Sequence, residues 1–229
     1  MSAGLPSGLA TDRARALELT PVSRETAAQL DQLVELLLDW QQRINLIAVS
    51  TAPVIWTRHI ADSLQLLEHA PQARTWVDLG SGAGFPGLVL ACALADQPGA
   101  VVHLIESNGK KATFLREAAR LIGAPAIVHG VRIEDFVKNF SDHPDAITAR
   151  ALAPLDQLLA LAHPLSKTGA QGLFPKGQDV ASELTKAAKY WKFKPILVPS
   201  KTSPQSRIVL VRHWERARRQ AVTPSTEPE

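Results

Sequence analysis

Cysteine is almost absent from this 229-residue chain, which contains only Cys92. A single cysteine cannot form an intramolecular disulfide, so we expect a reducing compartment, the cytoplasm. The seven histidines are scattered and show no spacing typical of a zinc site. No apolar run approaches the ~20 residues that span a bilayer, and the N-terminus carries no cleavage signature. We therefore expect a protein that binds neither a metal nor a membrane.

Positive charge is concentrated near the end of the chain. The formal net charge is only +3, but residues 176–219 contain eleven Lys or Arg against Asp179, Glu183 and Glu215, an excess of eight. A basic surface of this kind suggests a partner that carries phosphates. The alternative is an ordinary solvated face, and composition alone does not separate the two.

Composition and hydrophobic spacing divide the chain into four regions. We expect residues 1–20 and 214–229 to be flexible, the latter basic and then acidic, because small, polar and proline residues dominate the ends. Apolar residues recur with a helical period between Arg24 and Ile44, and a second helical segment follows over residues 53–69. We therefore expect an N-terminal helical cap over residues 21–70 and the main domain over residues 71–213.

From residue 75 onward, strand and helix patterns alternate. The expected strands are 75–79, 101–106, 125–129, 145–149, 170–175, 194–199 and 206–212. The expected helices are 86–96, 109–122, 154–165 and 178–191. Strands separated by helices of this length indicate right-handed βαβ units and a parallel sheet. The turn between the last two strands is too short for a helix, so these strands should form an antiparallel hairpin at the sheet edge.

The stretch VDLGSGAGFPG, residues 77–87, follows the first expected strand and opens a helix. Glycines allow positive φ and close approach of the backbone to a ligand, so the stretch indicates a cofactor loop. No Walker motif is present, which argues against a phosphate loop. NAD also fits poorly, because Asp78 would lie near its pyrophosphate. A cationic ligand without phosphate, S-adenosylmethionine, suits an acid at the strand end.

Glu106 closes the second expected strand, 26 residues after Gly80. An acid near this spacing binds ribose hydroxyls in dinucleotide sites, and a carboxylate forms charge-assisted hydrogen bonds to them. Both NAD and S-adenosylmethionine carry such a ribose. Glu106 therefore indicates a nucleoside ligand, while Asp78 separates the two candidates.

Seven short motifs occur in order between residues 24 and 212. They read NLIAVS, RHIADSL, VDLGSGAGFPG, ESNGKKATFL, VRIEDF, ARALAP and FPKGQ. Together they resemble the RsmG (GidB) family of bacterial 16S ribosomal RNA methyltransferases. The resemblance implies an α/β, Rossmann-like class I S-adenosylmethionine-dependent methyltransferase with a mostly parallel seven-stranded sheet. It also implies methyl transfer to N7 of one guanine in a loop of the small-subunit decoding region.

Nine residues are candidates for cofactor binding. The resemblance implies Gly80, Phe85, Ile133, Glu134 and Arg150, with Ile133 and Glu134 beside the adenine. The loop and strand arguments add Asp78, Gly82, Gly84 and Glu106.

Basic and polar residues near the expected crevice are candidates for RNA contact. They are Arg58, His59, Lys110, Lys111 and Lys176. Arg150 and Lys176 follow or end strands on the ligand side of the sheet, so both are also candidates to assist catalysis. For His59, three residues before Asp62 on one helical face, a structural hydrogen bond is the alternative.

The expected chemistry requires positioning rather than a catalytic base. N7 of guanine is a hydrogen-bond acceptor with no proton to remove. Cys92 lies inside an expected helix and is better explained as buried filler than as a nucleophile. The alternatives are a methyltransferase acting on another RNA or a metabolite, an NAD(P)-dependent oxidoreductase, and a non-catalytic RNA-binding protein. We expect a monomer whose partner is 16S ribosomal RNA or the small ribosomal subunit.

Overall fold

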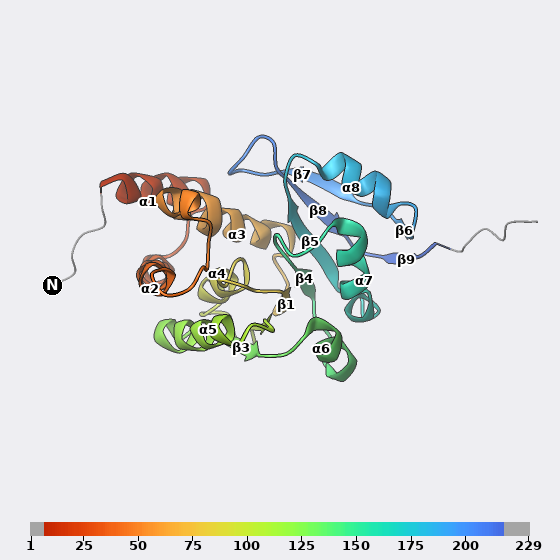
Figure 1. The fold of residues 1–229 in the computed structure, drawn as a ribbon, viewed down its shortest axis with the longest axis horizontal. Coiled ribbons are helices and arrows are strands. Elements are labelled where there is room, and N and C mark those ends of the chain that lie inside the picture. Colours follow the sequence, from red (N-terminus) through yellow and green to blue (C-terminus); the bar gives the residue numbers. More distant parts are fainter. Residues whose placement is uncertain (1–6, 218–229) are drawn as a thin grey trace, which may run out of the picture.

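A seven-stranded sheet lies at the centre of the computed structural model, which describes residues 7–217 (Figure 1). Its strands are β1 (Thr75–Leu79), β2 (Val101–Ile105), β3 (Ala126–His129), β4 (Ala146–Thr148), β5 (Gln171–Lys176), β7 (Ile196–Pro199) and β8 (Arg207–Val211). The order is β3-β2-β1-β4-β5-β8-β7, parallel from β3 to β5 and antiparallel on both sides of β8. The predicted parallel sheet and its antiparallel terminal hairpin are confirmed.

Strand β1 shows how the sequence builds a core on each face of the sheet. Successive side chains of a strand point to opposite faces. Trp76 accordingly packs in one hydrophobic cluster, and Val77 and Leu79 pack in the other. Asp78 shares the face of Trp76 and is also fully buried. A carboxylate in so apolar a strand requires a local partner.

Helices cover both faces of the sheet. The cluster around Trp76 includes α4 (Gly87–Ala93) and α5 (Gly109–Ile122). The other cluster includes α6 (Ile133–Asn139), α7 (Leu155–Ser166) and α8 (Val180–Ala187). The helices expected over 86–96, 109–122, 154–165 and 178–191 are present, mostly with shorter ends. Helix α6 was not expected, because its seven residues are too few to show a period.

The N-terminus differs from the expectation of a flexible segment over residues 1–20. Helix α1 (Ser7–Leu19) is held by contacts that lie far away in the sequence. Arg13 forms a bidentate ion pair with Asp31, in which Nε and Nη2 lie 2.7 and 2.8 Å from the two carboxylate oxygens. Asp12 accepts the backbone N–H of Trp56 at 2.8 Å. The composition of residues 1–20 does not reveal these distant contacts, so it predicted a flexible segment instead of a helix.

Helix α2 (Arg24–Gln41) confirms the first expected helix. Ser23 caps it by accepting the N–H of Thr26 at 3.0 Å, and its apolar side shares a core with α4 and α5. The second expected helix is broken into four short pieces. These are η1 (Val49–Val54), the π-helix η2 (Trp56–Ala61), α3 (Asp62–Leu64) and η3 (Gln65–His69). Such π-turns are frequent at functional sites.

A small second sheet corrects the expected boundaries at the C-terminus. Strand β6 (Trp191–Phe193) pairs antiparallel with β9 (Trp214–Arg216), inside the segment expected to be a flexible tail. The indoles of Trp191 and Trp214 are buried and donate to backbone carbonyls of α7 at 3.0 and 2.9 Å. The rest of the expected tail, residues 218–229, lies outside the described residues. No helix within residues 7–217 is long and apolar enough to cross a membrane.

Candidate functional site

The glycine loop connects β1 to α4 with backbone that favours glycine. Gly80 and Gly82 have φ of +67° and +55°. A Cβ on Gly80 would lie 2.6 Å from the side chain of Leu152, whereas a Cβ on Gly82 would meet only a carbonyl oxygen at 3.8 Å. Gly82 therefore faces open space, and Gly80 is packed against the loop that follows β4.

Asp78 lies beneath the loop. Its Oδ2 accepts the N–H of Gly87 at 3.2 Å, so it occupies the start of α4, and Oδ1 has no hydrogen-bond partner among the described residues. Burial raises the pKa of Asp78 to about 7, although hydrogen bonds with Ser81 and Gly87 and the charge of Arg150 oppose this. Asp78 thus removes an amide donor from a helix N-terminus at which a phosphate would otherwise bind.

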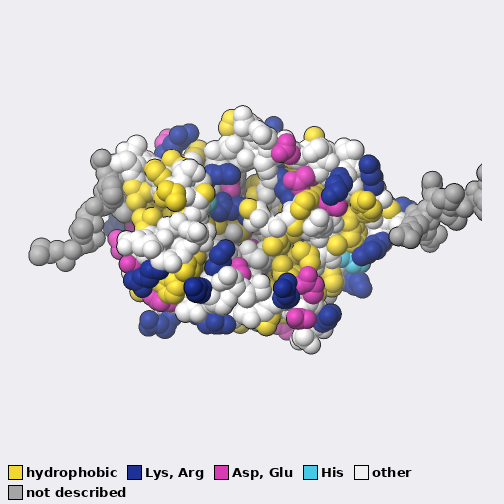
Figure 2. Space-filling view, viewed as in Figure 1, with side chains coloured by type: hydrophobic (Ala, Val, Ile, Leu, Met, Phe, Trp, Pro, Cys, Tyr) yellow, Lys and Arg dark blue, Asp and Glu magenta, His cyan; other side chains and the backbone are white. Residues whose placement is uncertain are grey.

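A cavity of about 610 Å³ opens beside the glycine loop, at the carboxyl ends of β1, β2 and β4. Figure 2 shows a hollow near the centre of this face, with Lys and Arg side chains around it. Seven of the nine predicted cofactor residues line the cavity: Gly80, Gly82, Phe85, Glu106, Ile133, Glu134 and Arg150. Asp78 and Gly84 do not. They lie under the loop, where a Cβ on Gly84 would be 2.5 Å from Leu88 of α4.

Glu106 ties the glycine loop to the end of β2. Its Oε2 accepts the N–H of Gly82 at 2.9 Å, and its Oε1 accepts the N–H of Asn108 at 2.7 Å. Each carboxylate oxygen can accept a further hydrogen bond. The side chain is half-buried at the cavity wall, so it can both hold the loop and accept a donor from a ligand.

A second cavity, of about 370 Å³, adjoins the first. Residues 150–153, between β4 and α7, line both cavities and separate them. Arg58 and Lys176, two of the predicted RNA contacts, line this second cavity rather than the first. The second cavity also contains two carboxylates, Asp62 and Glu183. The site therefore has room for two ligands side by side.

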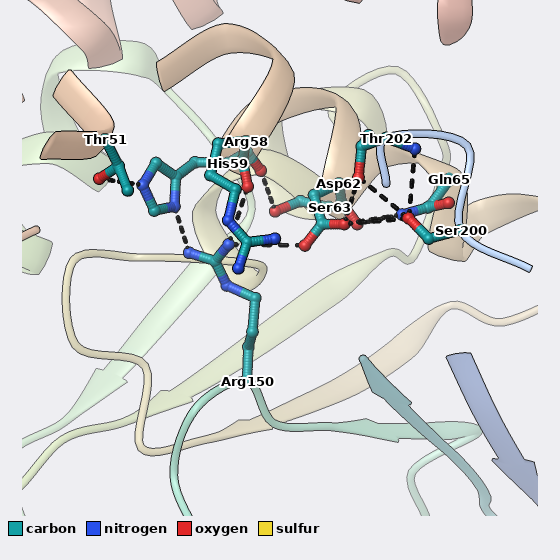
Figure 3. A network of polar contacts seen from close by, with 9 residues as sticks. All are labelled: Thr51, Arg58, His59, Asp62, Ser63, Gln65, Arg150, Ser200 and Thr202. Carbon is teal, nitrogen blue, oxygen red and sulfur yellow. Dashed lines mark hydrogen bonds and ion pairs between the residues drawn. The ribbon is translucent and has the colours of Figure 1, made fainter. Parts of the chain in front are cut away.

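Arg150 lies at the junction of the two cavities and is held from several sides (Figure 3). It donates to the carbonyl of Arg58 at 3.0 Å and to Nδ1 of His59 at 2.5 Å. Its Nη1 is 3.5 Å from Oδ2 of Asp62, and its guanidinium lies over the ring of Phe85 at 5.4 Å. These contacts fix the direction of a cation that is only 15% exposed.

His59 is a neutral acceptor in this arrangement. Burial, together with the charges of Arg150 and Arg58, lowers the pKa of His59 to about 3. Because Arg150 donates to Nδ1, the proton of the neutral ring lies on Nε2, which donates to Oγ1 of Thr51 at 2.9 Å. The ring also stacks on Phe85, with centroids 4.8 Å apart. His59 is 7% exposed and lines the first cavity, so its contacts favour the structural alternative, while a contact with RNA stays a prediction.

Asp62 connects Arg150 to the loop between β7 and β8. Its Oδ1 accepts Oγ1 of Thr202 at 2.8 Å and Nε2 of Gln65 at 3.0 Å, and Ser200 approaches it at 3.5 Å (Figure 3). Asp62 is 3% exposed, so its charge is balanced within the protein. Sequence reasoning missed Thr202 and Ser200, because no local pattern relates them to a residue about 140 positions earlier.

Lys176 does not present a free charge. Its Nζ forms an ion pair with Glu183 at 2.8 Å and donates to the carbonyl of Ala153 at 2.8 Å. The same Glu183 oxygen accepts the N–H of Leu155 at 2.7 Å. Lys176 thus holds the segment between the two cavities, and its expected contact with RNA phosphate stays a prediction. Glu183 carried no signal that sequence reasoning could have used.

Lys110 and Lys111 lie in the first turn of α5, beside the end of β2. Lys110 is exposed, and Lys111 is half-buried and lines the first cavity. Cations at a helix N-terminus add to its positive end, which is unfavourable for the helix and attractive to an anion. Both lysines therefore remain candidates for phosphate contact. Within residues 7–217, no group of three His, Cys, Asp or Glu side chains is arranged to hold a metal ion.

Comparison with known proteins places this site in a family. A family model described as "rRNA small subunit methyltransferase G" (GidB) matches residues 26–209. Two curated proteins named "Ribosomal RNA small subunit methyltransferase G", from Bradyrhizobium sp. (strain BTAi1) and Rhodopseudomonas palustris (strain BisB18), are 60% and 56% identical to this chain. The matches cover 91% and 96% of this chain and 94% of each relative.

Solved methyltransferases share the fold at low sequence identity. An O-methyltransferase from Bacillus cereus in complex with SAH has a TM-score of 0.59 at 15% identity, covering 90% of this chain and 99% of that one. The O-methyltransferase TomG from Streptomyces achromogenes, in complex with SAM, has a TM-score of 0.58 at 13% identity, covering 89% and 96%. The expected class I methyltransferase fold is confirmed. With a family model spanning residues 26–209 and relatives of this identity, the chain belongs to the GidB family of rRNA small subunit methyltransferases.

Proposed function

We propose that this protein transfers a methyl group from S-adenosylmethionine to N7 of a guanine in the decoding-region loop of 16S ribosomal RNA. Membership of the GidB family supports the reaction and the substrate class. The observation that carries the assignment of the site is the pair of adjoining cavities that share residues 150–153. One cavity would take the cofactor and the other the acceptor base.

The residues of the first cavity fit S-adenosylmethionine, which supplies a methyl group activated on a sulfonium. Glu106 would accept the ribose hydroxyls, and Ile133 offers an apolar surface to the adenine. The charge of Arg150 suits the carboxylate of the amino-acid part rather than the sulfonium, since like charges repel. Asp78 blocks the helix N-terminus on which the pyrophosphate of NAD would depend, which favours a ligand without phosphate.

The second cavity has the polar character that a guanine needs. Guanine presents the acceptors O6 and N7 and an amino donor on N2. Arg58 can donate to O6, which leaves the lone pair of N7 free, and Glu183 can accept from the amino group on N2. Because N7 carries a lone pair and no proton, the chain has only to orient the base and exclude water. No residue is assigned as a base. We propose that this occurs in the cytoplasm and that the protein acts as a monomer.

Methylation of ribosomal RNA from cells that lack the protein tests the proposal. We expect the purified protein to add one 7-methylguanosine to 16S RNA, detected by mass spectrometry of nuclease fragments, and to add none to RNA from cells that contain it. Calorimetry should show binding of S-adenosylmethionine and S-adenosylhomocysteine but not of NAD. Gly82→Val should abolish that binding, because the new side chain projects into the space beside the loop. Tight NAD binding, or methylation of another base, would contradict the proposal.

A further inference from the structure

The Lys and Arg side chains of residues 176–217 are of two kinds: some form ion pairs or hydrogen bonds within the protein, and others are free. Ion pairs hold three lysines: Lys176, Lys186 and Lys201. Arg207 donates to two backbone carbonyls at 2.8 Å. All four lie near the crevice or on elements beside it. Carboxylates balance the charges of the three lysines, so these contribute little attraction toward a polyanion. Arg207 keeps its charge, because its acceptors are neutral carbonyls, and it lines the second cavity.

The free cations lie elsewhere. Lys189 is exposed and its side chain has no hydrogen-bond or ion-pair partner within residues 7–217, and Arg216 lies over the ring of Trp191 at 5.5 Å. Lys192, Lys194 and Arg212 are also exposed, and within the same residues their side chains form no hydrogen bond or ion pair. All three line a third cavity, of about 710 Å³, which we call the distal groove. Its other lining residues are mainly apolar or aromatic: His69, Gln171, Trp191, Phe193, Ile196, Leu210, His213, Trp214 and Glu215. In Figure 2, dark-blue and yellow side chains lie together at the end of the molecule that holds β6 and β9.

The distal groove lies at the amino end of β5, whereas the second cavity lies at its carboxyl end. Gln171, the first residue of β5, lines the groove, whereas Lys176, the last residue of β5, lines the second cavity. At about 3.3 Å per residue, these two points are roughly 17 Å apart along the strand. A ligand in the groove is therefore separate from the cofactor and from the acceptor base.

The floor of the groove is rigid and aromatic. Trp191 and Trp214 lie on paired strands, and carbonyls of α7 satisfy both indole N–H groups. Both indoles are buried and form the floor, so Phe193, which is half-exposed beside them, offers the ring face on which a base can stack. Aromatic faces next to unpaired cations bind single-stranded RNA, because bases stack on the rings while the cations neutralise phosphates. Glu215 is the one acid in the lining, against three cations.

We propose that the distal groove binds a second, single-stranded segment of ribosomal RNA. The enzyme would then contact its substrate at both ends of β5. This inference rests on the proposed function. A symmetric pair of copies is a poorer occupant, because facing grooves would bring six unpaired cations together. A short RNA that carries only the target loop would reach the crevice alone, whereas full-length RNA would reach both surfaces.

A variant without the three groove cations tests the inference. The groove variant is Lys192→Gln with Lys194→Gln and Arg212→Gln, and the control variant is Arg15→Gln with Arg24→Gln and Arg120→Gln. Both remove three exposed cations, so the change of net charge is the same. For the groove variant we expect at least a tenfold higher KM for full-length 16S RNA with unchanged kcat. The slope of RNA affinity against salt should fall by about two to three. The kinetics on a short target hairpin and the affinity for S-adenosylmethionine should equal those of the wild type.

A separate variant distinguishes stacking from charge. Phe193→Ala should weaken binding of full-length RNA about fivefold or more while leaving the salt slope unchanged, because it removes a ring and no charge. Equal RNA affinity for the groove and control variants would overturn the inference. A defect seen only with particles that contain ribosomal proteins would also overturn it, because it would indicate an acidic protein in the groove. The same holds if the wild type is a dimer and the groove variant is a monomer. If the wild type bound RNA at the groove but methylated no guanine, the proposed function would be wrong and the inference about the groove would still hold.

Discussion

Glu106 combines two roles in one carboxylate, because it holds the glycine loop and faces the cavity. Glu106→Gln keeps one oxygen for the loop and removes the charge that strengthens bonds to ribose hydroxyls. Hydrogen bonds to charged groups contribute about 1.5–3 kcal/mol, so we expect at least a tenfold loss of S-adenosylmethionine affinity by calorimetry. Glu35→Gln, at an exposed position of α2 that lines neither cavity, serves as the control. A loss below threefold at Glu106 would make it a loop anchor only.

Asp78 and His59 should affect the pH dependence of stability in opposite directions. The pKa of Asp78 is about 7 in the folded protein against 3.8 unfolded, so between these values only the folded state holds the proton. Stability then falls as pH rises. The pKa of His59 is about 3 folded against 6.5 unfolded, so between these values only the unfolded state holds the proton. Stability then rises with pH and is fully present above 6.5.

Two variants separate these contributions. Relative to the wild type, Asp78→Asn should gain free energy of unfolding as pH rises from about 4 to 7, by up to about 1.4 kcal/mol per pH unit. His59→Asn should show the reverse trend from about pH 3 to 6.5. Urea unfolding at a series of pH values measures both. Parallel curves for Asp78→Asn and wild type would show that Asp78 is ionised in the folded protein at all these pH values.

At the scale of elements, helix α1 supports the start of the π-helix that carries His59. Asp12 accepts the N–H groups of Trp56 and Thr57 and the hydroxyl of Thr57. Asp12→Ala leaves these buried or half-buried donors unpaired, so we expect a loss of about 1–3 kcal/mol in the free energy of unfolding. It should also weaken cofactor binding, because η2 also carries Arg58, whose carbonyl holds Arg150.

Asp39→Ala is the matched control for this prediction. Asp39 pairs with Arg43 at the surface, where both side chains are more than half exposed, and such pairs contribute about 0–1 kcal/mol. Chemical unfolding followed by tryptophan fluorescence compares the two variants. If Asp12→Ala proved as mild as Asp39→Ala, α1 would be an attachment without influence on the site.

The elements that could be predicted from sequence are those determined by their own residues. The strand–loop–helix of residues 75–93, the helix from Arg24 and the position of Glu106 all follow from local patterns. The strands β6 and β9 do not, because each has three residues and depends on a partner more than 20 positions away. The breaks in the helix over residues 49–69 were also missed, since two of the residues that contact this segment, Asp12 and Arg150, lie far away in the sequence. For the same reason the sequence identified the cavity lining but not the side chains that hold Arg150.

At the scale of the whole molecule, free and engaged cations should respond differently to salt. RNA affinity should fall steeply with salt, whereas cofactor affinity should change little. Lys110→Gln with Lys111→Gln should lower the RNA salt slope by about two, one unit for each lost phosphate contact. Lys176→Gln should leave that slope unchanged, because Lys176 already pairs with Glu183. Filter binding across a salt series measures this, and an equal reduction in slope at Lys176 would identify it as an RNA contact.

The link from Asp62 to Thr202 has a consequence for how the protein is made. The two residues are 140 positions apart, so a growing chain exposes Asp62 long before its partner is synthesised. Until then, the carboxylate that orients Arg150 lacks one of its donors, and the segment that bears His59 has no stable packing against the β7–β8 loop. A prematurely terminated chain without the β7–β8 loop would also lack Ser200, Ser206 and Arg207 of the second cavity, although every lining residue of the first cavity precedes position 162. Activity would begin only when almost the entire chain has left the ribosome.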